Sequence, residues 1–341
     1  MAVPVGPSRQ MRDKTMITRR ILLAATLLAP LGTFSLSNDA AAQAPREIRL
    51  DFATYNPISL VLKEKGFLEK AFAKDGISIR WVQTLGSNKA LEFLNAGSID
   101  FGSTAGSAAL VAKINGNPIK SVYVYSRPEW TALVTRKDTG ITKVADLKGK
   151  RVAVTRGTDP HIFLVRALAE AGLTEKDVKL VLLQHPDGRL ALERGDVDAW
   201  AGLDPMMAAT EVESGSVLFY RKPEANTWGI LNVREEFAKK HPELVTRVLE
   251  TYEEARRWSL ANPQEVKKIF AEFTKLPPTV VDRQLDERTE LTHSVIGEPQ
   301  RESILAAGLA LQGAGVIPAH VDVKAALDDL IDPRYLSKAT N

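Results

Sequence analysis

Turns of glycine and small hydroxyl residues follow several predicted strands of this chain and directly precede predicted helices. The clearest example is the segment 103–107, Ser-Thr-Ala-Gly-Ser, which follows the predicted strand 99–102. The segment 157–159, Gly-Thr-Asp, has the same position after the predicted strand 151–155. A helix N-terminus carries backbone N–H groups without intrahelical partners and a partial positive charge. These turns therefore predict an anion-binding site made of backbone amides and hydroxyl groups.

Other candidate ligand contacts lie at equivalent positions along the chain. Ser59 follows the first predicted strand, and Ser87 with Asn88 follows the second; serine is also an ordinary helix-starting residue. Asp159 precedes Pro160, as a helix cap would, but an Asp159 that faces the site would favour a zwitterion over a bare anion. The predicted ligand-binding residues are Ser59, Ser87, Asn88, Ser103, Thr104, Ala105, Trp130, Gly157, Thr158, Asp159, Asp204 and Trp228.

Three further residues of this set have two readings each. Trp130 and Trp228 flank the places where the chain is expected to cross between two lobes. An indole there can cover the alkyl part of a ligand, and core packing is the alternative for each. Asp204, like Asp159, can be a structural residue before a proline or a residue that faces the site. Trp200, inside an apolar strand, is expected in the core.

Signatures of catalysis and of metal binding are missing from the sequence. The segment 102–106 has Thr where the hydrolase nucleophile elbow needs Ser, and no phosphate-loop or dinucleotide fingerprint occurs. The chain has no Cys, which excludes disulfides, thiolate metal sites and a Cys nucleophile. His161 and His185 lack partners at metal-ligand spacing and are interpreted as ordinary polar residues. We therefore expect a binding protein that is not an enzyme and has no cofactor or metal.

The first 42 residues have the three parts of a secretory signal. Arg19 and Arg20 precede the apolar run 21–31, and a small-residue tract over 40–44 offers a cleavage site. The run is too short for a membrane-spanning helix, which needs about 20 residues. Residues 1–42 contain five Lys or Arg and two Asp, so they carry the whole net charge of +3 and leave the remainder neutral. The expectation is a periplasmic protein, and nothing in its charge indicates nucleic-acid binding.

The elements that must position these residues alternate between strand and helix from residue 47, which indicates mainly parallel sheets covered by helices. Strands are expected over 48–53, 77–84, 99–102, 120–125, 151–155, 178–183 and 198–202. Helices are expected over 59–74, 87–96, 105–114, 162–172 and 187–194, and again from residue 235. The predicted parts are a leader over 1–42, lobe I over 46–133, lobe II over 134–225, and a return to lobe I with C-terminal helices over 226–341.

Four segments resemble the aliphatic-sulfonate-binding proteins of ABC importers. They are 95–102, 144–154, 161–168, and 193–200 with the following Asp204-Pro205. The resemblance extends over about 46–271 and implies a type II periplasmic-binding-protein fold, in which two α/β lobes joined by a hinge close on a ligand in their cleft. Two departures concern the expected pocket wall: Leu203 and Met206 stand where the family often has aromatic residues, and 157–161 differs from its usual Gly-Ser-Asn turn.

The resemblance implies a periplasmic receptor that binds a small anionic or zwitterionic solute and delivers it to a membrane permease with its ATPase. Aliphatic sulfonates or related organosulfur oxyanions are the expected ligands. Sulfate esters, taurine, nitrate or a vitamin precursor are alternatives within the same class. A periplasmic sensor module and an enzyme on the same fold are alternatives of another class.

Overall fold

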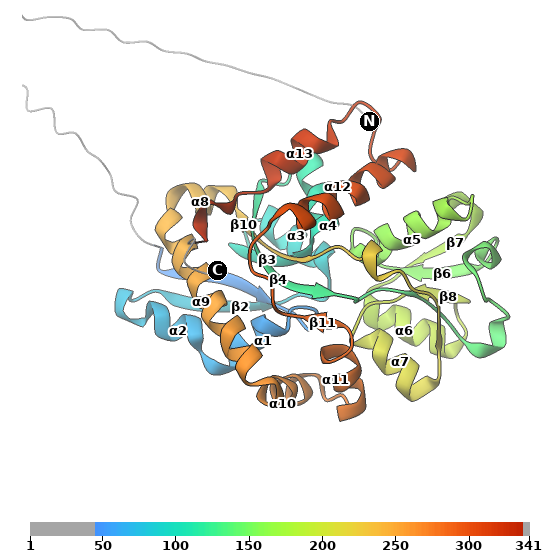
Figure 1. Ribbon diagram of the computed structural model, residues 1–341, viewed down its shortest axis with the longest axis horizontal. Coiled ribbons are helices and arrows are strands. Elements are labelled where there is room, and N and C mark those ends of the chain that lie inside the picture. The colour runs from blue at the N-terminus through green and yellow to red at the C-terminus, as the bar shows by residue number, and fades with distance from the viewer. Residues whose placement is uncertain (1–44, 337–341) are drawn as a thin grey trace, which may run out of the picture. The chain divides into compact units, whose positions relative to one another are not determined.

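The computed structural model describes residues 45–336 and contains two α/β lobes, each built on one sheet (Figure 1). The leader predicted over 1–42 lies outside these residues. Lobe I has the strand order β11-β4-β10-β3-β1-β2, and lobe II has the order β7-β6-β8-β5-β9. The strands of lobe I are β1 (Glu47–Phe52), β2 (Ser78–Gln83), β3 (Phe101–Ala105), β4 (Ile119–Pro128), β10 (Gly229–Arg234) and β11 (Thr289–Glu290). The strands of lobe II are β5 (Leu133–Thr135), β6 (Arg151–Val154), β7 (Lys179–Leu182), β8 (Ala199–Ala201) and β9 (Val217–Tyr220).

Both sheets have a parallel part and an antiparallel part. β1 pairs in parallel with β2 and β3, and β6 pairs in parallel with β7 and β8. The strands next to the crossings between lobes, β5 and β10, pair antiparallel with their neighbours. The chain crosses from β4 to β5 over 129–132 and returns from β9 to β10 over 221–228. The predicted α/β class with two lobes is confirmed.

Helices cover the sheets and also connect the two lobes. Those of lobe I are α1 (Pro57–Lys65), α2 (Phe67–Phe72), α3 (Ser87–Asn95), α4 (Gly106–Ile114), α8 (Glu235–Lys240), α9 (Pro242–Ala261), α10 (Pro263–Thr274), α11 (Pro278–Leu285), α12 (Glu298–Gly313) and α13 (Val323–Leu330). Those of lobe II are α5 (Asp159–Glu170), α6 (His185–Arg194) and α7 (Met206–Ser214). α5 packs against α4 and α12, and α7 packs against α11, so helices of both lobes are in contact. Over residues 45–336, no helix is both long enough and apolar enough to cross a membrane.

Each lobe has an apolar core of its own. Leu50, Phe101 and Leu231 are fully buried between the lobe I sheet and its helices. In lobe II, Val152 on β6 packs among apolar residues of α5 and the neighbouring strands. Trp200 on β8 is buried, as the sequence predicts. The strand ends and helix starts that form the candidate site are therefore held by two separate packed layers.

The turn predicted at 103–105 is wrong, because these residues belong to strand β3. Ser103, Thr104 and Ala105 pair antiparallel with residues 229–231 of β10. Helix α4 begins at Gly106, whose N–H donates to the Trp228 carbonyl oxygen over 3.0 Å. The small side chains suit the buried interior of the sheet, where Ser103 donates to Asp51. Small hydroxyl residues after an apolar strand therefore continue the strand here and do not form an open loop.

Candidate functional site

A small cavity lies between the two lobes, where three helices begin. Its volume is about 10 Å³, roughly the space that one water molecule needs. The lining residues are Tyr55, Ser87, Trp130, Thr158, Asp159, Pro160, His185 and Leu203. They come from both lobes and from the first crossing between them. A solute larger than water therefore does not fit in this cavity with the lobes arranged as they are here.

The helices that begin at the cavity are α3 at Ser87, α5 at Asp159 and α6 at His185. Gly86 precedes α3. Pro160 and Pro186 lie in the first turns of α5 and α6, where the missing N–H of proline costs no intrahelical hydrogen bond. Each helix start leaves N–H groups without intrahelical acceptors and contributes a partial positive charge. No Lys or Arg is among the described residues that line the cavity. Its attraction for an anion would come from amides, hydroxyls and helix dipoles.

Asp159 reaches from lobe II to lobe I and to both crossings. Its Oδ1 accepts from the Ser107 hydroxyl at 2.5 Å and the Thr227 hydroxyl at 2.8 Å. Its Oδ2 accepts from the Trp130 indole N–H at 2.8 Å and the Thr227 backbone N–H at 3.0 Å. Burial raises the pKa of Asp159, and these hydrogen bonds lower it in part. The carboxylate is satisfied by the protein itself and joins the lobes beside the cavity.

His185 differs from Asp159 because its side chain forms no hydrogen bond with the described residues. The side chain is 0% exposed, and neither ring nitrogen has a hydrogen-bond partner among the described residues. Burial lowers its pKa to about 3, so the ring is neutral near pH 7. The ring lies against Gly86 of lobe I: a Cβ at that glycine would be 3.3 Å from His185 Nε2. The same Cβ would be 2.8 Å from Asn88 Oδ1, which is also buried without a partner.

A polar network in lobe I supports the lobe I wall of the cavity. Asp51 Oδ1 accepts from the Ser103 N–H and hydroxyl, at 2.8 and 2.9 Å, and Asp51 Oδ2 accepts from the Thr84 hydroxyl at 2.8 Å. Burial raises the pKa of Asp51 to about 7. The Tyr55 hydroxyl lies 2.8 Å from the Thr84 hydroxyl. The Tyr55 and Trp130 rings then meet edge to face, with centroids 6.2 Å apart, so the network positions an aromatic wall.

Four of the predicted site residues line the cavity: Ser87, Trp130, Thr158 and Asp159. Ser87 Oγ accepts from the Ala105 N–H at 3.0 Å, which leaves its own O–H free to donate. The Thr158 hydroxyl donates to the Thr155 carbonyl at 2.7 Å. Two other predicted residues meet across the lobes, since a Cβ at Gly157 would be 3.7 Å from Asn88 Cβ.

The remaining predicted residues do not line the cavity. The Ser59 hydroxyl donates to the Asn56 carbonyl at the start of α1, and Thr104 Oγ1 accepts from Asn232 Nδ2 inside the sheet. Ser103 and Ala105 also lie on β3, as described above. Asp204 is ion-paired with buried Arg288 at 3.3 Å. Trp228 packs edge to face on His293, with centroids 4.8 Å apart, outside this cavity.

Four lining residues were not among the predicted set: Tyr55, Pro160, His185 and Leu203. In the sequence, Leu203 is notable only because it stands where the resembled family often has an aromatic residue. Strand β7 ends at Leu182, and helix α6 begins at His185, which is followed by Pro186. Asp159-Pro160 has the same position at the start of α5, after strand β6. The His185-Pro186 pair in the sequence thus indicates a helix start at His185.

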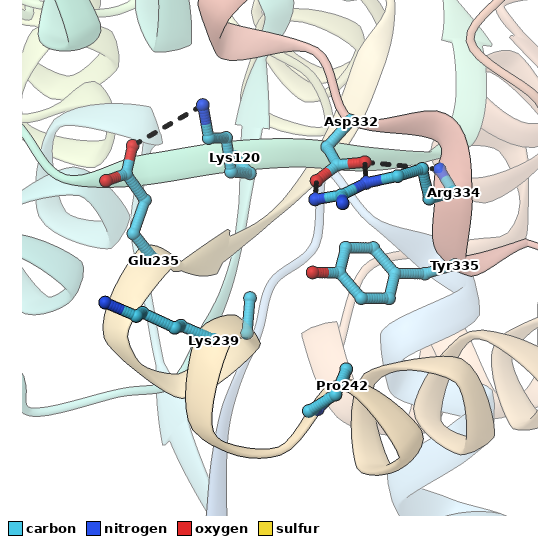
Figure 2. Close-up of a pocket in the computed structure, with 8 residues that line it drawn as sticks. Lys120, Glu235, Lys239, Pro242, Asp332, Arg334 and Tyr335 are labelled. Carbon is cyan, nitrogen blue, oxygen red and sulfur yellow. Dashed lines mark hydrogen bonds and ion pairs between the residues drawn. The ribbon is translucent and has the colours of Figure 1, made fainter.

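A larger cavity of about 400 Å³ lies elsewhere on lobe I, between β4, α8 and the C-terminal segment (Figure 2). Four of its five charged side chains are paired with one another, whereas Lys239 has no ion pair among the described residues. Arg334 lies 2.6 Å from Asp332, and Lys120 lies 3.8 Å from Glu235. The unpaired polar groups at the lobe interface make the smaller cavity the better candidate. Within residues 45–336, no group of three or more His, Cys, Asp or Glu is arranged to hold a metal ion.

Comparisons with known proteins support a shared fold and ancestry. A family model described as NMT1/THI5 like matches residues 56–266. A protein of Escherichia coli (strain K12) named for binding aliphatic sulfonates is 31% identical over 274 residues, which are 80% of this chain and 84% of that protein. The solved alkanesulfonate-binding protein SsuA from Xanthomonas axonopodis pv. citri, bound to MOPS, is 26% identical with a TM-score of 0.76. That match covers 86% of this chain and all of the SsuA chain.

Proposed function

Because this chain belongs to the NMT1/THI5-like family, we propose that it is the solute-binding component of an ABC importer. The proposed ligand is an aliphatic sulfonate or a related organosulfur oxyanion. The E. coli relative, which is named for binding aliphatic sulfonates, and the alkanesulfonate-binding protein of Xanthomonas, which is bound to MOPS, support this ligand class. The receptor delivers the solute to a membrane permease and its ATPase.

One observation carries the proposal: helix N-termini from both lobes converge on a cavity whose lining has no Lys or Arg among the described residues. A sulfonate has a single charge spread over three oxygens, and backbone N–H groups and hydroxyls can surround all three. Ser87 lines the cavity, and its hydroxyl, which accepts from the Ala105 N–H, can still donate to such an oxyanion. Each charge-assisted hydrogen bond to such an oxyanion contributes about 1.5–3 kcal/mol.

Closure explains how so small a cavity can serve a larger solute. The lobes separate at the crossings over 129–132 and 221–228, the ligand enters, and both sets of helix ends then enclose it. Trp130 lies at the first crossing and lines the cavity, so its surroundings change with closure. Ligand binding therefore should reduce the radius of gyration in solution scattering and alter tryptophan fluorescence.

The receptor acts in the periplasm after export. Residues 1–42 have the composition of a cleaved signal, and the mature chain would begin between residues 41 and 45. N-terminal sequencing of protein from periplasmic extract checks this. A chain that retains the apolar run 21–31 and fractionates with membranes would contradict the proposed route.

Isothermal titration of the mature protein tests the ligand class. The panel contains 1-propanesulfonate, 2-hydroxyethanesulfonate, 2-aminoethanesulfonate, an alkyl sulfate ester and nitrate. At least one sulfonate should bind more tightly than nitrate and raise the unfolding temperature by mass action. Binding of the sulfate ester or nitrate in preference to every sulfonate would overturn the proposed ligand class. Rapid turnover of any of these compounds would favour the enzyme alternative.

A further inference from the structure

We propose that His185 contacts the ligand and selects sulfonates that carry a hydroxyl or ammonium group near the sulfonate. The inference rests on the proposed function and names a narrower ligand class within it. Its basis is the unpaired polar groups that meet where α6 of lobe II faces the start of α3 in lobe I.

The unpaired groups lie close to one point. Asn88 Oδ1 and His185 Nε2 are 2.8 and 3.3 Å from the position that a Cβ on Gly86 would occupy. The Gly86 backbone has a φ of 165°, an extended conformation that any residue can adopt. The absence of a side chain is therefore required by space and not by backbone geometry. A side chain on Gly86 would collide with both polar atoms, so glycine is what lets the start of α3 lie against the His185 ring.

The chemistry of these unpaired atoms specifies the ligand group that would pair with them once the ligand occupies the cavity that His185 lines. A neutral imidazole has one N–H donor and one nitrogen acceptor, and an amide oxygen is an acceptor. Both His185 nitrogens and Asn88 Oδ1 are buried without partners among the described residues. A ligand with a hydroxyl or ammonium group can donate to the unprotonated ring nitrogen or the amide oxygen. The ring N–H can donate in turn to an oxygen of the same ligand.

The remaining ionisable groups of the cavity agree with this ligand class. Asp159 and Tyr55 are the other titratable residues in the lining. Asp159 already accepts four hydrogen bonds from the protein, so it adds negative charge without needing the ligand. A ligand with a cationic or dipolar end beside its sulfonate is less repelled by this carboxylate than a plain alkanesulfonate is.

Isothermal titration calorimetry with sulfonates of equal size tests the proposal. 1-Propanesulfonate and 2-hydroxyethanesulfonate have the same number of heavy atoms and differ by a methyl group in place of the hydroxyl. The wild-type protein should bind 2-hydroxyethanesulfonate or 2-aminoethanesulfonate about tenfold or more tightly than 1-propanesulfonate, as expected for one buried hydrogen bond. His185→Leu should lower affinity for the donor-bearing ligand by about tenfold and leave 1-propanesulfonate within about twofold. His185→Gln, which retains a donor and an acceptor, should recover part of the loss.

His161→Leu is the matched control. His161 is a buried histidine of lobe II in the first turn of α5, but its Nε2 lies 2.9 Å from Glu175 and it does not line the cavity. It should leave all affinities unchanged. Circular dichroism melting curves show whether each variant folds. If His185→Leu does not fold, the affinities of His185→Gln for the same ligands decide the result.

Three results would overturn the inference. Tighter or equal binding of 1-propanesulfonate by the wild type refutes the selected ligand class while the proposed function stands. Equal losses for all sulfonates in His185→Leu and His185→Gln would show that the ring supports closure and does not recognise the donor. If no sulfonate binds the wild type, the proposed function and this inference are both wrong. This result differs from the first two, in which sulfonates still bind the wild type.

Discussion

Replacing Asp159 separates the bonds that join the lobes from the contacts made to a ligand. The carboxylate receives two hydroxyl donors on Oδ1 and two N–H donors on Oδ2. The hydroxyls have another partner in each other, because Thr227 Oγ1 lies 3.2 Å from Ser107 Oγ. The Trp130 indole N–H and the Thr227 backbone N–H depend on the carboxylate.

The two substitutions Asp159→Ala and Asp159→Asn should differ widely in stability. Alanine leaves the Trp130 and Thr227 N–H groups buried without an acceptor, which costs about 1–3 kcal/mol each, or about 2–6 kcal/mol in all. Asparagine can direct its carbonyl oxygen to these N–H groups and its NH₂ to the two hydroxyls, which rotate to accept. Its free energy of unfolding should fall by only about 0–1.5 kcal/mol, because neutral hydrogen bonds replace charge-assisted ones.

Urea denaturation of the ligand-free mature protein, followed by circular dichroism, measures the difference. Asp187→Ala is the control, since Asp187 also lies in the first turn of a lobe II helix but is exposed. Its loss should cost about 0.3–1 kcal/mol through the helix dipole alone. If Asp159→Ala is no less stable than the Asp187→Ala control, the four hydrogen bonds do not contribute as argued and the reasoning fails.

Three further predictions concern lobe I. Burial raises the pKa of Asp51 to about 7 from an ordinary value near 3.8, so the folded state binds the proton more tightly than the unfolded state. The contribution of Asp51 to the unfolding free energy should thus fall by about 1.4 kcal/mol per pH unit as the pH rises from about 4 to 7. Urea denaturation at several pH values should show that Asp51→Asn lacks this slope. If the unfolding free energies of the wild type and of Asp51→Asn change in parallel with pH, the prediction is wrong. Ser87→Ala should weaken sulfonate binding about tenfold. Thr104→Val should leave affinity within about twofold and lower stability by about 0.5–1.5 kcal/mol, because Asn232 Nδ2 loses the Thr104 hydroxyl but keeps the Gly102 carbonyl oxygen as an acceptor. The reverse pattern in calorimetry and denaturation would place the anion contact on β3.

The alternation of strands and helices was predictable because it follows from local patterns. Apolar runs with β-branched residues predict most strands of both sheets, and the five helices expected before residue 200 begin within three residues of the observed ones. The end of β3 was not predictable in this way. Whether Ser103 faces solvent or Asp51 depends on a residue about fifty positions earlier that the sheet places beside it.

The same limit applies to the tryptophans and aspartates of the predicted site. Trp130 and Trp228 both lie next to crossings, but only Trp130 lines the cavity. Trp228 instead has Arg127 above its ring, 5.4 Å from the centroid, and His293 at its edge. Asp204 pairs with Arg288 from the C-terminal part of lobe I. Contacts between distant segments decide these roles, and residue type and local position do not carry that information.

Asp159 and His185 show which observation does separate structural groups from groups that await a ligand. Both are buried first-turn residues of lobe II helices, and both line one cavity. The hydrogen bonds of Asp159 are completed by four donors of the protein, whereas His185 has none among the described residues. Because a buried polar group without a partner is unfavourable, a closed state with an unpaired ring is complete only when something else supplies the bond. That difference makes Asp159 the connection between the lobes and His185 the residue that faces the solute.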